Sequence, residues 1–500
     1  MTDLNGSTNR IALAPNVYVL APGLVGTVEL LDTALLGTRA DEPQRATPAL
    51  TSALANQEFA TLHSLEIAAT PVVGPAAPAN RGADNRPLLT LEVPDRGPDQ
   101  PQVVLLADEQ GVVTWHFAQP TIRPNTVRFD IPADTVATAA PPGPGQTRGL
   151  VSLIGKKLLS VLVFKALEAG AKVLAQVLAE EWENQHRPSR LRRFTGPGDC
   201  ATVTPIDGHA WDVLRGGRAL LFIHGTCSTS QGGFGALDAE VWGQLRKRYD
   251  DRVFAYDHPT LSVDPLTNVN TLKKLVPPGV PLDVDIIAHS RGGLVARALA
   301  CAGNDASFPV HPNKIVHVGV PNAGTALANV ERYGTFIDRT STLLNLAPDG
   351  PLSVVADILD GILTVVKIIG CNGIGALPGL SAMDPANQWL RDLAARPARS
   401  HTAYAIGSDY APSGGVLQLV RVPDGLADLV FSNDANDMVV PADGVYDAAS
   451  ATGFPIPTER RIAFSKSEGV WHCAYFGQHK TQQGLLDWLT GADAAAPSPA

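Results

Sequence analysis

The sequence predicts a protein of the α/β class, in which a mostly parallel sheet flanked by helices follows a smaller β-rich region and a long helix. Two observations lead to this prediction. From about residue 196 onward, short apolar runs alternate with segments whose apolar residues recur at helical spacing, as in a parallel sheet covered on both faces. Before that point, runs rich in β-branched residues are separated by turn-forming segments, as in an antiparallel sheet.

The composition limits the classes of protein to consider. The chain has 500 residues, of which 45% are apolar and 18% charged, enough for more than one domain with its own core. A formal net charge of −10 disfavours a nucleic-acid partner, because such proteins usually carry a basic surface. The sequence has neither a phosphate-binding loop nor the Cys/His spacing of a metal site, so we expect no metal and no organic cofactor.

The cysteines and the N-terminus favour a cytoplasmic protein. The 5 cysteines are scattered and odd in number, which implies no disulfide framework. The first residues lack the basic start and apolar stretch of a secretory signal. Segments 150–182 and 352–369 are apolar but carry charges at three- to four-residue steps, so we expect buried helices rather than membrane spans. A helix lying on a membrane surface is the alternative, which leaves peripheral membrane contact open.

Residues 1–145 are predicted to form a small antiparallel, β-sandwich-like domain, whose role and partner the sequence does not indicate. The Pro- and Gly-rich run 141–146 predicts its end. Its predicted strands are 16–20, 88–93, 103–106, 112–117 and 127–131.

Residues 146–195 are predicted to form a long helical connector. Four arginines lie near its end: Arg187, Arg190, Arg192 and Arg193. A basic patch of this length is typical of a solvated helix end, where positive charge is favoured by the helix dipole.

Residues 196–500 carry the alternating pattern and are predicted to be one α/β domain. Residues from about 330 to 398 interrupt the alternation with apolar helical stretches, which predicts an inserted helical cap over an apolar pocket. The predicted strands are 219–223, 253–256, 284–288, 314–320, 403–407 and 462–464, and the predicted helices include 291–302 and 482–489.

The candidate nucleophile is Ser290, at the apex of a tight turn between the strand 284–288 and the helix after it. Ala288 stands two residues before it and Gly292 two residues after it. Small residues are needed there because the turn brings the strand and helix backbones together around the serine. The alternative is that Ser290 only caps the helix.

The segment from Ala288 to Gly293, Ala-His-Ser-Arg-Gly-Gly, resembles the nucleophile turn of bacterial lipases and related carboxylesterases of the α/β-hydrolase fold. In some of these the first glycine of Gly-x-Ser-x-Gly is likewise alanine. The resemblance covers roughly residues 218–490. It implies a serine hydrolase that cleaves carboxylic esters, lipid or other acyl esters, through an acyl-enzyme. An amide, thioester or phospholipid substrate stays open, as does a regulatory or interaction protein that keeps the fold with little turnover.

Two backbone N–H groups are expected to stabilise the oxyanion of such a reaction. Arg291 follows the nucleophile and supplies one of them. In the lipase family the residue after a His-Gly pair supplies the other, and here that residue is Thr226. His224 and Gly225 are expected to contribute to the substrate site, and His289 to be a packing or pocket residue.

A serine nucleophile needs a neighbouring histidine that a carboxylate orients, and the three together form a catalytic triad. In this fold the acid and then the histidine follow the serine along the chain. The family's acid lies in an Asn-Asp-x-x-Val/Pro-like loop, and Asp437 matches it best, with Asp434 as the alternative. His472 is the expected base, since it lies between the last predicted strand and the last helix. His479 lies at the start of that helix, where a capping or surface role is expected.

Overall fold

The computed structural model divides the chain into two compact units, which are described here one at a time. The N-terminal unit comprises residues 1–175, 333–374 and 413–432, and the C-terminal unit comprises residues 176–332, 375–412 and 433–500. The structure describes residues 1–31, 53–54, 56–71, 88–107, 113–119, 121, 123–132, 157–165, 171–194, 196, 205–329, 333–334, 337, 340–341, 352–370, 377–410, 435–448 and 451–491.

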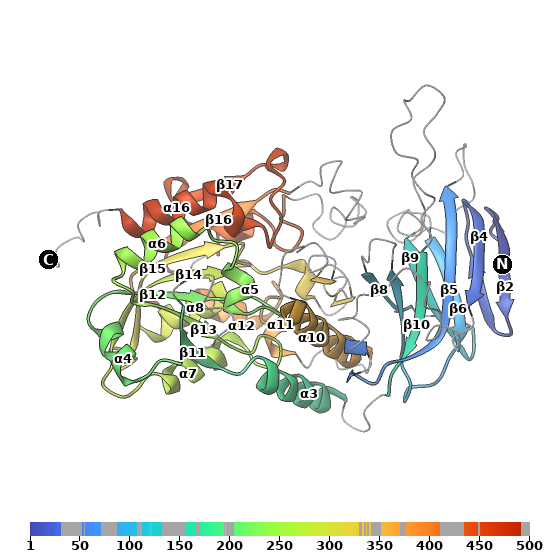
Figure 1. Cartoon of the computed structure of the whole chain (residues 1–500), viewed down its shortest axis with the longest axis horizontal. Helices are drawn as coiled ribbons and strands as arrows, with labels where there is room; N and C mark the ends of the chain where they lie inside the picture. The colour runs from blue at the N-terminus through green and yellow to red at the C-terminus, as the bar shows by residue number, and fades with distance from the viewer. Residues whose placement is uncertain are drawn as a thin grey trace. The chain divides into compact units, whose positions relative to one another are not determined.

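The N-terminal unit is built on a ten-stranded sheet in which every neighbouring pair is antiparallel (Figure 1). Apolar side chains from both halves of this sheet meet in one buried cluster, so the sheet folds back on itself. All five strands predicted for this region are observed. The strands, in their order across the sheet, are β1 (Thr2–Asn5), β4 (Leu24–Leu31), β5 (Ala60–Pro71), β10 (Lys157–Val163), β7 (Gln102–Ala107), β8 (Val113–Gln119), β9 (Thr126–Pro132), β6 (Leu88–Pro94), β3 (Val17–Leu20) and β2 (Ile11–Ala14).

The prediction of one long helix over 146–195 is wrong in its middle. Lys157–Val163 is strand β10, which pairs with β5 on one side and β7 on the other. Leu159 and Val161 on this strand belong to the buried cluster. The buried residues therefore recur every two positions, as in a strand, and not every three to four positions, as in a helix. The helix that follows, α3 (Ala171–His186), begins later than predicted. The N-terminal sheet therefore takes a strand from beyond residue 145, and the run 141–146 lies outside the described residues.

The C-terminal unit contains the predicted mostly parallel sheet. Its strand order is β11 (Arg190–Arg193), β13 (Val253–Asp257), β12 (Ala219–Ile223), β14 (Leu282–His289), β15 (Val310–Val318), β16 (Thr402–Ser408) and β17 (Arg461–Phe464). All neighbouring pairs are parallel except β11 with β13. Because β13 lies on one side of β12 and β14 on the other, the strand order reverses at β12. Parallel sheets bind their ligands at the carboxyl ends of the strands beside such a reversal.

Helices cover both faces of this sheet (Figure 1). On one face, α6 (Ala239–Arg248) and α16 (His479–Thr490) bury their apolar sides. On the other face, α4 (Gly208–Arg215), α7 (Pro265–Leu275), α8 (Gly292–Ala302) and α12 (Gln388–Ala395) do the same. Burial on both faces explains why the strands are continuous apolar runs rather than alternating ones.

The predicted cap at 330–398 is not one structural element. Residues 333–374, which include α10 (Leu352–Gly370), group with the N-terminal unit by their contacts. The helix α12 at the other end of the range belongs to the helical layer of the sheet, because its Leu393 lies in the same buried cluster as α8. A cap over the site stays a prediction for the rest of this range.

The arginine patch is an edge strand and not a solvated helix end. β11 pairs with β13, and Arg192 is only 2% exposed. The Nε atoms of Arg190 and Arg192 lie 3.1 Å and 3.5 Å from Oδ2 of Asp257 at the end of β13. A buried carboxylate needs such partners, since an unpaired buried charge is costly. The sheet therefore begins before residue 196.

No helix in the described part of the chain has both the length and the apolar composition needed to cross a membrane. The helix α10 matches the segment 352–369 that was predicted to be a helix.

Candidate active site

Ser290 lies in the sharp turn between β14 and α8 with its backbone in the left-handed region, at φ 52°. This conformation is unfavourable for a residue with a side chain, and such strain is often found at functional sites. The turn packs tightly against the end of β12. A Cβ atom at Gly292 would lie 2.4 Å from the carbonyl oxygen of Ile223 and 2.5 Å from that of His224, so only glycine fits there.

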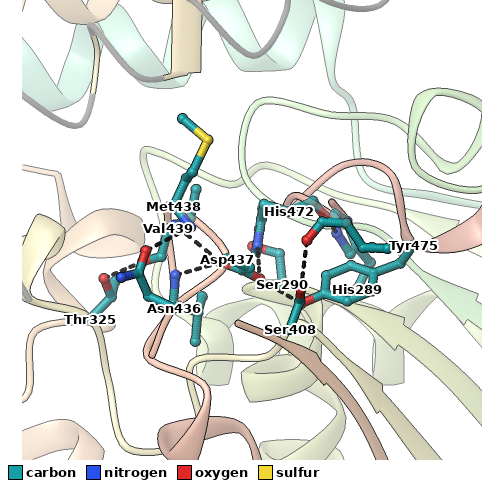
Figure 2. Close-up of polar contacts among 12 residues, drawn as sticks. His289, Ser290, Thr325, Ser408, Asn436, Asp437, Met438, Val439, His472 and Tyr475 are labelled. Atoms are coloured by element: carbon teal, nitrogen blue, oxygen red, sulfur yellow. Dashed lines mark hydrogen bonds and ion pairs between the residues drawn. The ribbon is translucent and has the colours of Figure 1, made fainter. Parts of the chain in front are cut away.

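The structure brings Ser290, His472 and Asp437 together in one chain of hydrogen bonds (Figure 2). The Oγ atom of Ser290 is 2.9 Å from Nε2 of His472, and Nδ1 of His472 is 2.8 Å from Oδ2 of Asp437. The three residues come from the turn after β14, the loop after β17 and the loop after β16. The Asp437 carboxylate therefore orients the His472 imidazole towards the Ser290 hydroxyl, the arrangement that can activate a serine.

The carboxylate of Asp437 is held ionised by its surroundings. Its Oδ1 accepts hydrogen bonds from the backbone N–H groups of Val439 (3.0 Å) and Val440 (2.7 Å). Burial by itself raises the pKa of this carboxyl, but the neighbouring His472 and the hydrogen-bond donors outweigh burial and lower the pKa below its ordinary value. The alternative acid, Asp434, lies outside the described residues.

Tyr475 is a member of this group that the sequence reasoning missed. Its hydroxyl donates a 2.8 Å hydrogen bond to Oδ2 of Asp437, the same oxygen that faces His472 (Figure 2). Burial raises the pKa of Tyr475 well above its ordinary value, so the hydroxyl stays a donor. Its position three residues after His472 is the only sequence signal, and nothing local distinguishes it from a core tyrosine.

His289 is hydrogen-bonded to the backbone of His472. Its Nε2 is 3.0 Å from the carbonyl oxygen of His472, and its ring packs against the rings of His472 and Phe476. Burial, helped by the nearby His472, lowers the pKa of His289 to about 3, so the ring is neutral and Nε2–H donates. These are contacts of a packing residue, and a place for His289 in a substrate pocket stays a prediction.

The loop after β12 lies directly against Ser290. A Cβ atom on Gly225 would lie 2.6 Å from Cβ of Ser290 and 3.2 Å from its Oγ. The predicted oxyanion donors, the N–H groups of Thr226 and Arg291, flank this contact in the sequence. No residue in the described part of the chain accepts a hydrogen bond from either N–H group.

His224 fixes the orientation of the Gly225–Thr226 peptide group. The backbone N–H of His258 donates to Nε2 of His224 at 3.1 Å, so the proton of the neutral ring is on Nδ1. Nδ1–H then donates to the carbonyl oxygen of Gly225 at 2.9 Å. Because N–H and C=O of a trans peptide point in opposite directions, the N–H of Thr226 is directed away from His224. Burial lowers the pKa of His224 to about 4, so the ring is neutral at neutral pH and its two hydrogen bonds select this tautomer.

The side chain of Arg291 is fully buried, although its backbone N–H is the group expected to act on substrate. The guanidinium donates to the carbonyl oxygens of Gly379 (2.9 Å) and Val263 (2.5 Å) and to Oδ1 of Asn268 (3.0 Å). Burial lowers its pKa to about 10, so it stays charged at neutral pH. Arg291 thus ties the turn at Ser290 to the loop after β13, to α7 and to the short helix α11 (Pro378–Ser381).

The described residues contain no cluster of side chains that could form a metal site. No three His, Cys, Asp or Glu side chains come together there as a metal would require. A cavity of about 260 Å³ lies between α8 and α12, lined by Ala298 and Trp389 among others. It is at the C-terminal half of α8, whereas Ser290 precedes the N-terminus of that helix. His479 is the first residue of α16, as expected.

These features define an α/β protein with a hydrogen-bonded Ser–His–Asp group at the carboxyl ends of parallel strands. The chain belongs to a family described as a domain of unknown function, DUF7379, whose sequence model matches residues 186–490. No curated protein matches the sequence.

Among solved structures, the chain is similar to a lipase from Bacillus licheniformis in its mature form, at 14% identity and a TM-score of 0.32, over 54% of this chain and 91% of the lipase. For lipase 1 from Pelosinus fermentans the identity is 11% and the TM-score 0.36, over 55% of this chain and 99% of the lipase. For a phospholipase from Legionella pneumophila the identity is 13% and the TM-score 0.31, over 46% of this chain and 45% of the phospholipase. None of these likenesses is close enough to identify an activity.

Proposed function

We propose that this protein is a serine hydrolase that cleaves carboxylic esters through an acyl-enzyme, with Ser290 as nucleophile. The observation that carries the proposal is the unbroken hydrogen-bond chain from Ser290 through His472 to Asp437. A serine hydroxyl is a weak nucleophile, and a neighbouring imidazole that is oriented by a carboxylate is the arrangement that activates it.

The first half of the reaction forms the acyl-enzyme. His472 takes the proton of Ser290 at Nε2 as Oγ attacks the ester carbonyl, and Asp437 stabilises the imidazolium that results. The tetrahedral intermediate collapses when His472 gives this proton to the leaving alcohol. In the second half, water attacks the acyl-enzyme with the same proton transfers and releases the acid.

The N–H groups of Thr226 and Arg291 would stabilise the oxyanion. One lies on the loop that touches Ser290 and the other directly follows Ser290 at the start of α8. An N–H group at a helix start favours negative charge. Each such donor contributes on the order of 3 kcal/mol to the transition state.

The proposal names the bond that is cleaved, and the length of the preferred acyl group has to be determined separately. A series of p-nitrophenyl esters from acetate to palmitate determines this length, because the kcat/KM of an enzyme that acts on lipid esters increases with acyl chain length. A maximum at acetate would exclude lipids as the preferred substrates.

The test of the proposal is the pair of wild-type protein and Ser290→Ala. We expect the wild type to hydrolyse p-nitrophenyl butyrate and to be labelled by a fluorophosphonate on Ser290, as mapped by peptide mass spectrometry. Ser290→Ala is expected to lose both the labelling and the turnover. Ser228→Ala, on the loop after β12, is the matched control and should keep both. Turnover retained by Ser290→Ala, or a wild type with neither turnover nor labelling, would contradict the assignment.

A further inference from the structure

A buried carboxylate from outside the parallel sheet holds the loop that follows β13. Glu183, on α3, is fully buried, and it precedes the residues that match the family. It accepts hydrogen bonds from the backbone N–H groups of Thr260 (2.5 Å), Leu261 (2.8 Å) and Ser262 (2.8 Å) and from the hydroxyls of Thr260 (3.3 Å) and Ser262 (2.6 Å). Hydrogen bonds to an ionised group are stronger than those between neutral groups, so this carboxylate fixes the loop 260–262 firmly.

The same loop is hydrogen-bonded to the strand end beside the nucleophile. The hydroxyl of Thr260, which donates to Glu183, accepts a 3.1 Å hydrogen bond from the backbone N–H of Cys227. Cys227 has φ 54°, a conformation that needs support from its surroundings. The N–H of Cys227 belongs to the peptide group that follows the one carrying the N–H of Thr226. The Thr260 hydroxyl therefore connects Glu183 to the proposed oxyanion loop.

The other oxyanion donor rests on this loop as well. Arg291 donates from its guanidinium to the carbonyl oxygen of Val263, one residue after the stretch that Glu183 holds. The negative charge of Glu183 also acts on Arg291. Burial lowers the pKa of the guanidinium, and Glu183 is the largest influence in the opposite direction. One carboxylate thus stabilises the loop and compensates the buried charge beside Ser290.

We infer that Glu183 is a positioning residue for the oxyanion site, acting through Thr260 on Thr226 and through Val263 on Arg291. The inference rests on the proposed function, because the oxyanion site has a purpose only if Ser290 attacks a carbonyl group. Through Glu183, the helix α3 has an indirect part in the geometry of the oxyanion site and is more than a connector.

Substitutions at Thr260 separate this role from general stability. Thr260→Val keeps the shape of the side chain but removes the acceptor of the Cys227 N–H. Thr260→Ser restores the hydroxyl. Ser262→Ala is the matched control, because it also removes a hydroxyl that donates to Glu183 but has no hydrogen bond to the loop after β12 among the described residues. Glu183→Gln places an amide NH₂ against backbone donors, and Thr260→Val keeps the test valid if that variant does not fold.

The measurements are kcat and KM for p-nitrophenyl butyrate and hydrogen–deuterium exchange of the peptide covering residues 224–230. For Thr260→Val we expect kcat to fall about tenfold with KM within about twofold, because a displaced oxyanion donor weakens transition-state binding only. Exchange at 224–230 should rise in the same variant. Thr260→Ser should restore both, and Ser262→Ala should leave kcat within about twofold of the wild type. Glu183→Gln, where folded, should match or exceed the loss in Thr260→Val.

The two proposals fail in different ways. If the wild type hydrolyses the ester but Thr260→Val changes neither kcat nor exchange, the positioning role of Glu183 is refuted and the hydrolase assignment stands. Equal losses of kcat in Thr260→Val and Ser262→Ala would also refute it, because they would show a general loss of structure. If the wild type has no turnover but exchange at 224–230 rises in Thr260→Val, the loop support is upheld and the hydrolase assignment fails.

Discussion

Gly225→Ala is the substitution whose effect follows most directly from the geometry of the site. The added Cβ would lie 2.6 Å from Cβ of Ser290. Carbon atoms in favourable contact are about 3.5–4.0 Å apart, so the loop after β12 has to move back by about 1 Å. Gly225 is not among the residues with positive φ, and the change therefore acts through this contact rather than through backbone strain.

A displacement of about 1 Å carries the N–H of Thr226 out of reach of the oxyanion, and misplacements of that size cost about 10²-fold in rate. Loss of one oxyanion donor costs about 10²- to 10³-fold in kcat. We therefore expect kcat of Gly225→Ala to fall at least about 10²-fold, with KM changed much less because the donor acts in the transition state.

The assay is steady-state hydrolysis of p-nitrophenyl butyrate, with circular dichroism and thermal unfolding as measures of structure. Gly243→Ala is the matched control, because a Cβ at Gly243 in α6 meets nothing within 4 Å and alanine is favoured in a helix. That variant should keep wild-type kcat. The reasoning is refuted if Gly225→Ala keeps kcat within about threefold of the wild type, or if both variants lose the same amount.

Two further predictions concern the acid and a buried histidine. Asp437→Asn is expected to lower kcat by about 10³- to 10⁴-fold, because the amide no longer holds the imidazole in the required tautomer, while Asp434→Asn stays within about twofold. The opposite order of the two variants would show that Asp434 is the acid. His224 has its pKa lowered from 6.5 to about 4 in the folded state, so between these pH values the unfolded chain binds a proton that the folded one does not. The unfolding free energy should therefore fall by up to about 3 kcal/mol from this residue as pH decreases from 6.5 to 4, measured by urea unfolding at each pH. His224→Gln should remove this part of the decline, and an identical decline in both proteins would contradict the assignment.

The sequence predicted those parts of the site that are encoded locally. Ser290 was recognised because a buried apolar run, small residues and a helix follow one another within a short segment. Arg291 was predicted from its place directly after Ser290, and Thr226 was implied by the resemblance to the lipase family, on the His224-Gly225 pair before it. His472 was predicted from its place between the last strand and the last helix, and Asp437 was implied by its match to the family's acid loop, with Asp434 as the alternative. The structure places Asp437 and His472 in hydrogen-bond contact.

The residues that were missed act across long separations in the chain. Glu183 reaches Thr260, 77 residues away. Arg190 pairs with Asp257, 67 residues away, whereas the basic run alone predicts a solvated helix end. A local window shows only a glutamate on a helix or an arginine in a basic run, so neither role was accessible from the pattern.

The strand β10 shows the same limit for secondary structure. Over a segment as short as Lys157–Val163, the apolar residues fit both the two-residue period of a strand and the longer period of a helix. The segment forms a strand because it pairs with both β5 and β7. Strand preference depends on the neighbours that a residue packs against, more than helix preference does.

By itself the sequence determined the class of the C-terminal sheet and the tight turn that carries Ser290, because both depend on periodicity or on neighbours along the chain. Only the tertiary structure decided how Asp437 is held by Tyr475, how His224 directs the Thr226 N–H, and how Glu183 supports the loop beside them. These contacts depend on where separate segments meet, and buried charges and hydrogen-bonding groups require partners wherever the fold places them.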